Sequence, residues 1–215
     1  MKKFLETSLP LVGFIAGAYS VVSQWVIILL KPGDDKSLIT ETIRYYSYMT
    51  VWTNILVTLC FGAVTVFASA RWADFFRRSA VQSGTVVYII IVGLAYHFLL
   101  SATFNPTGLE WFGNLLLHYI NPVLYVLYWL IAIEKHPASY MLALRWLVFP
   151  FTYFIYSLIR GFITDWYPYF FVDVTTLGYP QVMLVSALLM CGYALIGAIV
   201  VYLNSLKGKA ELISE

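Results

Sequence analysis

Six long apolar runs dominate this 215-residue sequence. A helix needs roughly 20 mostly apolar residues to cross the hydrocarbon core of a bilayer, and each run approaches or exceeds that length. Charged stretches, or stretches containing Pro and Gly, separate the runs, as expected for loops between membrane helices. The sequence therefore predicts an all-α polytopic membrane protein, a bundle of six transmembrane helices. These helices should lie near residues 8–30, 44–70, 85–104, 112–133, 138–163 and 180–206.

The composition agrees with a membrane protein built as one domain. Only 11% of the residues are charged and 61% are hydrophobic, whereas a soluble domain carries about 25% charged residues. Six helices and their links occupy nearly the whole chain, so we predict a single domain, residues 1–215. The first run resembles a signal peptide, but Glu6 and Pro10 interrupt it and its apolar residues continue to residue 30. We therefore expect it to be retained as the first helix.

The basic residues predict the orientation of the chain. Lysine and arginine gather at both ends and in alternate loops, as at Lys2, Arg77 and Lys135, and are fewer in the remaining loops. The positive-inside rule then places both termini in the cytoplasm. The longest connection, "GFITDWYPYFFVDVTTLGYP" at residues 161–180, falls outside, between helices five and six. Because aromatic rings favour the headgroup layer, we expect this loop to cap the mouth of the bundle.

Several classes of site and partner are disfavoured. Cys60 and Cys191 both fall inside predicted spans, which argues against a disulfide framework and against a zinc site. We expect no metal, no organic cofactor and no nucleic-acid partner. No aspartate or glutamate lies deep in a span, which makes a proton-coupled pump a poor candidate.

Polar side chains gather at one depth of the predicted bundle. Counting inward at about 1.5 Å per residue places Thr50, His97 and His118 about six or seven residues from the outer ends of their helices. Gln24 and Tyr156 fall at a similar depth. We therefore predict a polar chamber in the outer half of the bundle, whereas the inner halves of the helices should show ordinary helix packing.

Helical spacing predicts which of these residues share a face. Residues three, four or seven apart lie on one side of a helix, and a polar face should turn inward because unpaired polar groups are unfavourable in lipid. The predicted inward faces are Ser47, Thr50 and Asn54; His97 and Ser101; Asn114, His118, Asn121 and Tyr125; and Tyr153, Tyr156 and Arg160.

A threonine near a histidine in a dry cavity suits nucleophilic catalysis. The Thr50 hydroxyl would attack an acyl carbonyl while the His118 imidazole takes its proton. The alternative is that Thr50 only joins membrane helices and that His118 bonds a backbone carbonyl freed by Pro122. Thr53 offers a second hydroxyl, and His97 is either an alternative base or a hydrogen-bonding partner in the cavity.

Three further residues could support this chemistry. Without a deep carboxylate, Asn121, one turn from His118, or a tyrosine would orient the imidazole. Asn54 either donates to an oxyanion or bridges two helices through its amide. Arg160 either clamps a substrate carboxylate, or reaches the headgroups or pairs with Asp165 or Asp173.

Three motifs resemble a bacterial group of six-span predicted membrane proteins. They are "YYSYMTVWTNILV", "LLLHYINPVLYVLYWL" and "FPFTYFIYSLIRGFITDWYPYFFVDV". That group is distantly similar to the androgen-induced and androgen-dependent TFPI-regulating protein family, whose members hydrolyse fatty acid esters of hydroxy fatty acids with an intramembrane threonine and histidine. The resemblance implies Thr50, in "YMT", as nucleophile and His118 as base, in a bacterial cytoplasmic membrane.

We therefore expect an intramembrane hydrolase of lipid esters. Thr50 attacks the ester, His118 acts as base and then acid, Asn54 and its neighbours stabilise the oxyanion, and Arg160 holds an acidic head. The expected partners are membrane lipids and a lipid or fatty-acid-derived small molecule. The alternative function is non-enzymatic binding or transport of an amphiphilic molecule in the same chamber.

Overall fold

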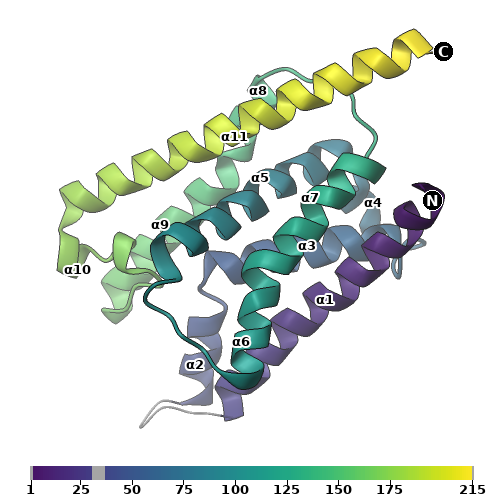
Figure 1. Cartoon of the computed structure of the whole chain (residues 1–215). Helices are drawn as coiled ribbons and strands as arrows, with labels where there is room; N and C mark the ends of the chain where they lie inside the picture. Colours follow the sequence, from purple (N-terminus) through teal and green to yellow (C-terminus); the bar gives the residue numbers. More distant parts are fainter. Residues whose placement is uncertain (1, 31–36, 215) are drawn as a thin grey trace. The chain divides into compact units, whose positions relative to one another are not determined.

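The computed structural model describes residues 2–30 and 37–214, which form helices and loops without a strand (Figure 1). The chain divides into two compact units, Met1–Glu134 and Lys135–Glu215, each described here by itself. Within the described part, five helical stretches are long and apolar enough to cross a membrane, and a bent pair, α2 (Leu38–Tyr45) with α3 (Met49–Val64), would make a sixth. The chain thus has the all-helical build of a multi-pass membrane protein.

In the first unit, helix α1 (Lys2–Leu30) packs most extensively against α3 (Figure 1). Gly13 and Gly17, spaced four residues apart, lie buried on the side of α1 that meets α3. A Cβ atom at Gly17 would lie 2.3 Å from the Thr58 hydroxyl oxygen, and one at Gly13 would lie 2.3 Å from the Phe61 ring. Small residues with this spacing let two membrane helices approach closely.

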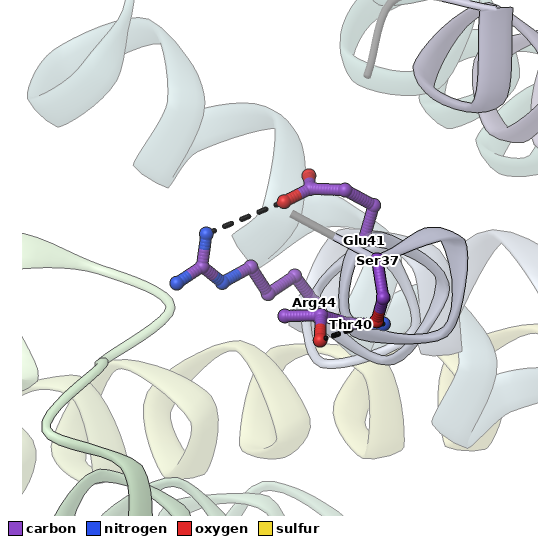
Figure 2. A network of polar contacts seen from close by, with 4 residues as sticks. All are labelled: Ser37, Thr40, Glu41 and Arg44. Atoms are coloured by element: carbon purple, nitrogen blue, oxygen red, sulfur yellow. Dashed lines mark hydrogen bonds and ion pairs between the residues drawn. The ribbon is translucent and has the colours of Figure 1, made fainter. Parts of the chain in front are cut away.

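Helix α2 begins with a side-chain cap. The Ser37 hydroxyl accepts a hydrogen bond from the Thr40 backbone N–H at 3.2 Å, and Arg44 pairs with Glu41 at 3.3 Å one turn later (Figure 2). The cap satisfies a backbone donor that has no partner inside the helix. The opposite end of α2 is held to α1, because the Tyr45 hydroxyl donates to the Val21 carbonyl at 2.7 Å.

The predicted helix at residues 44–70 differs from the structure. The chain bends by 70° between α2 and α3, and α3 ends at Val64. Two side-chain hydrogen bonds connect the bend to the helices on either side. The Trp52 indole of α3 donates to the Tyr46 carbonyl at 2.6 Å, and the Ser47 hydroxyl donates to the Ile43 carbonyl of α2 at 2.5 Å. The bend places Thr50 in the first turn of α3 rather than in the interior of a long helix.

The rest of the first unit contains two helices with π-helical turns. The short α4 (Ala73–Arg77) leads into α5 (Ser79–Ala95), which continues as the π turn η1 (Tyr96–Leu100). Helix α6 (Gly108–Leu115) passes through a second π turn, η2 (Leu116–Ile120), into α7 (Asn121–Ala132). Helix α7 packs against both α1 and α5.

Helices α5 and α7 of this unit make buried polar contacts with each other. The Tyr125 hydroxyl donates to the Gln82 side-chain oxygen at 2.6 Å, and the Trp129 indole donates to the Ser83 hydroxyl at 3.1 Å. Tyrosine and tryptophan on α7 bury polar atoms that need partners, and α5 supplies these partners.

The second unit comprises α8 (Met141–Trp146), α9 (Val148–Thr164), the 3₁₀ turn η3 (Phe170–Val172), α10 (Val174–Leu177) and α11 (Tyr179–Ser214). Helix α9 ends at Asp165, whose φ of 50° is left-handed. The aromatic segment after it folds back on α9, because the Tyr167 ring fills the space beside Gly161 and the Tyr169 ring lies 6.4 Å from that of Tyr153.

Asp173 organises the end of that aromatic segment. Its carboxylate accepts hydrogen bonds from the backbone and hydroxyl groups of Thr175 and Thr176 at the start of α10. Partial burial tends to raise the pKa of this carboxyl, but the four hydrogen bonds outweigh it and lower the pKa below its usual value. Asp173 is therefore an ionised helix cap.

Candidate functional site

The π turn η2 determines the surroundings of His118. In this turn each backbone N–H binds the carbonyl five residues earlier instead of four, so the Asn121 N–H binds the Leu116 carbonyl. The Leu117 carbonyl thereby loses its α-helical partner, and Pro122, the residue that would be its π-helical partner, has no N–H. The extra residue of the π turn thus leaves the Leu117 carbonyl, next to His118, without a backbone partner, so its hydrogen bond must come from another helix.

Asn54 of α3 satisfies that acceptor. Its amide nitrogen donates to the Leu117 carbonyl at 3.1 Å and to the Thr50 carbonyl at 2.9 Å. One side chain therefore links the turn that carries Thr50 to the turn that carries His118. A primary amide has two hydrogens, and both are used, so Asn54 has none left for an oxyanion. Of its two predicted roles, the structure supports the helix-bridging one.

Asn121 extends this link to a third helix. Its amide nitrogen donates to the Asn54 side-chain oxygen at 2.9 Å and to the Ser20 hydroxyl at 3.0 Å. We call Asn54, Asn121 and Ser20 the amide clasp; all three are almost completely buried. The Asn121 hydrogens are both used within the clasp and its amide oxygen has no hydrogen-bond partner, so the predicted contact of Asn121 with the imidazole is not observed.

The imidazole of His118 is oriented by Asn114 instead. The His118 Nδ1 atom lies 3.0 Å from the Asn114 backbone carbonyl, one turn earlier. A carbonyl oxygen only accepts hydrogen bonds, so a neutral ring carries its hydrogen on Nδ1 and its lone pair on Nε2. His118 is partly exposed. This is the tautomer that a general base acting through Nε2 requires.

Tyr96 of η1 covers one face of this imidazole. The two rings are stacked, with centroids 3.8 Å apart and planes inclined by 20°. The Asn114 amide donates to the Tyr96 hydroxyl at 2.6 Å. Asn114 therefore holds the histidine through its backbone and the tyrosine through its side chain. We call His118, Tyr96 and Asn114 the imidazole cluster.

His97 lies on the exposed side of η1, outside this cluster. Its Nδ1 atom is 3.2 Å from the Tyr119 hydroxyl. The two π turns therefore make two neighbouring contacts: Tyr96 of η1 stacks on His118 of η2, and His97 of η1 lies within hydrogen-bonding distance of Tyr119 of η2. His97 was predicted as either an alternative base or a hydrogen-bonding partner, and the contact with Tyr119 is a hydrogen bond.

The two candidate nucleophiles differ in their surroundings. Thr50 is buried, and its backbone carbonyl is joined to the amide clasp. Thr53 is fully buried, and its hydroxyl has no hydrogen-bond partner. Thr50 lies in the turn that Asn54 connects directly to η2, which favours it over Thr53.

Tyr156 and Arg160 lie on α9 of the second unit. The Tyr156 ring is 6.2 Å from that of Tyr153, and the Arg160 guanidinium lies 4.9 Å from the centroid of the Trp166 ring. Within the described residues Arg160 makes no ion pair, so the predicted pairing with Asp165 or Asp173 is not observed. Arg160 keeps its charge available for an anion.

In the first unit, Asn54 thus links the turn of Thr50 to the turn of His118 and accepts a bond from Asn121, and Tyr96 and Asn114 contact the imidazole. Helical spacing placed Asn114 on the same face as His118 but predicted no role for it. Tyr96 was not predicted, because the sequence indicates it only through its position next to His97. Among the described residues, no group of three His, Cys, Asp or Glu side chains could hold a metal ion.

Comparisons with protein-family models, with curated proteins and with solved structures each find no match to this chain. The resemblance of the three motifs to the bacterial six-span group therefore stays a prediction.

Proposed function

We propose that this protein is an intramembrane hydrolase of lipid esters, with Thr50 as nucleophile and His118 as general base. The observation that carries the proposal is the position of the Asn54 amide nitrogen, 2.9 Å from the Thr50 carbonyl and 3.1 Å from the Leu117 carbonyl. This nitrogen ties the turn of the candidate nucleophile to the residue that precedes the candidate base.

The reaction follows from the chemistry of these two groups. The His118 Nε2 atom takes the Thr50 hydroxyl proton while the hydroxyl oxygen attacks the ester carbonyl carbon. The tetrahedral intermediate expels the alcohol, which takes the proton from His118, and leaves an acyl-threonine. A water molecule, deprotonated by His118, then releases the acid and restores Thr50. One ester and one water thus yield one acid and one alcohol.

The first turn of α3 suits the negative charge that develops in this reaction. Thr50 is the second residue of that helix. The positive end of a helix macrodipole stabilises negative charge, and the effect is stronger where water is excluded. The helix start therefore supplies part of the electrostatic stabilisation that was predicted for Asn54.

The proposed substrate rests on two grounds: the apolar surroundings indicate a membrane lipid, and the resemblance of the three motifs implies the type of ester. A hydrolase buried in apolar helices would draw its substrate from the membrane, and the proposed substrate is an acyl ester of fatty acid ester of hydroxy fatty acid type, needing no cofactor. The proposed location is a bacterial cytoplasmic membrane.

Ester turnover in proteoliposomes tests this proposal. Purified protein would be assayed with 4-methylumbelliferyl palmitate and with the palmitoyl ester of hydroxystearic acid. We expect Thr50→Ala and His118→Ala to abolish turnover with folding intact, whereas Thr53→Val, the matched control, retains it. Folded wild type that binds these amphiphiles without hydrolysing them would contradict the proposal and favour the binding alternative.

A further inference from the structure

The Tyr96 hydroxyl lies in the imidazole cluster, and one of its hydrogen-bonding functions is unused. Its oxygen accepts the hydrogen bond from the Asn114 amide at 2.6 Å. The hydroxyl hydrogen must therefore point elsewhere, and no residue in the described part of the chain accepts it. Tyr96 is 5% exposed, so this donor is held in a mostly buried position.

The two asparagine amides of the clasp cannot act as donors in its place. The amide hydrogens of Asn54 and Asn121 are all used within the amide clasp. A developing oxyanion requires a donor that is already in position before the reaction, because reorganising one during the reaction would raise the barrier. Tyr96 meets this requirement, since stacking on His118 and the bond from Asn114 both restrict its ring.

We propose that the Tyr96 hydroxyl donates a hydrogen bond to the carbonyl oxygen of the ester as that oxygen becomes negative. Tyr96 is then a catalytic residue that touches the substrate, and Asn114 is a positioning residue for both Tyr96 and His118. The inference rests on the hydrolase proposed above. It adds a residue to the same site, and it predicts a substrate with a hydrogen-bond-accepting carbonyl.

The arrangement also explains why one asparagine contacts both rings. The donation from Asn114 to the phenol oxygen polarises the hydroxyl and makes it a stronger donor, because hydrogen bonds in a chain reinforce one another. The bond from His118 to the Asn114 carbonyl keeps Nε2 as the basic nitrogen. One residue therefore controls both the base and the donor.

Tyr96→Phe tests the inference, because it removes the hydroxyl and keeps the stacked ring. We expect kcat for ester hydrolysis to fall about 100-fold, as for loss of one oxyanion donor, with KM and melting temperature little changed. The matched control is Tyr128→Phe, which removes another buried tyrosine hydroxyl of the same unit and should leave kcat unchanged. A Tyr96→Phe protein as active as wild type would overturn the role of Tyr96 while the hydrolase stands.

Two non-natural residues at position 96 distinguish hydrogen bonding from packing, even if phenylalanine perturbs the fold. p-Aminophenylalanine keeps a donor at the same place, whereas p-methylphenylalanine has similar size and no donor. We expect the amino variant to retain much of the wild-type kcat and the methyl variant to lose about 100-fold. Equal activity of the two would overturn the inference. A wild type that hydrolyses no ester would remove the proposed function itself, and the inference with it.

Discussion

At the scale of single residues, the amide clasp is the part of the site whose hydrogen bonds are most completely defined. The orientation of the Asn54 amide is determined because its nitrogen faces two carbonyls. The Asn54 oxygen must then accept, so the Asn121 group that faces it must be its nitrogen. These bonds join three helices, and the Asn54 amide also binds the carbonyls of Thr50 and of Leu117, the residue before His118.

A double-mutant cycle on the clasp measures this coupling. Asn54→Ala and Asn121→Ala should each cost about 1–3 kcal/mol of stability, because each leaves buried partners unsatisfied. The double variant should cost less than the sum, by about 1 kcal/mol, because the two side chains bond to each other. Unfolding in mixed micelles by titration with SDS would measure these energies. Additive losses would contradict a direct bond between the two amides.

Much of the candidate site could be predicted from residue depth, but not its bonding. Counting inward from the helix ends predicts Thr50 and His118 at a similar depth, and in the structure the Asn54 amide binds the Thr50 carbonyl and the carbonyl of Leu117, the residue before His118. The Asn114 carbonyl was not predicted as the partner of the imidazole, although Asn114 lies one turn before His118, because helical spacing groups side chains and assigns no backbone acceptor. The π turn at Leu116–Ile120 adds a residue and rotates every later position by about 100°. Spacing rules assume a regular helix, so they did not predict the bonds of Asn121 within the amide clasp.

At the scale of elements, the close contact of α1 and α3 depends on small residues. Gly13→Ala should cost about 1–3 kcal/mol, because its Cβ would collide with the Phe61 ring, which is fully buried. Ile15→Ala is the control, since Ile15 is 59% exposed. The same SDS titration would compare them. Equal stability of Gly13→Ala and wild type would contradict the tight packing.

The helices themselves could be predicted because apolar runs of membrane length leave few alternatives. The bend at residues 46–48 could not, since it depends on contacts between segments. The Trp52 indole reaches back to Tyr46, and Tyr45 is tied to Val21 of α1. The aromatic and polar residues of "YYSYMT" are thus used to end one helix and start another with Thr50 in its first turn.

At the scale of the whole molecule, the number of crossings determines where the two ends of the chain lie. If the bent α2–α3 pair crosses the membrane, six crossings put both termini on one side, whereas five would separate them. The distribution of Lys and Arg leads us to expect both termini in the cytoplasm.

Reporter fusions in bacteria test this expectation. Green fluorescent protein fused to either end should fluoresce, and alkaline phosphatase fused to either end should be inactive. Thr103→Cys, in the loop before α6, should react with an impermeant maleimide added from outside, and Ser139→Cys should not. Opposite results at the two termini would contradict six crossings.

The central claim, that His118 activates Thr50, is tested most directly by a fluorophosphonate probe that bonds covalently to activated hydroxyl groups. The adduct on purified protein in detergent would be mapped by mass spectrometry in wild type, Thr53→Val and His118→Ala. We predict an adduct on Thr50 in wild type and in Thr53→Val that is absent from His118→Ala. Folded wild type without an adduct, or equal labelling in all three proteins, would contradict the claim.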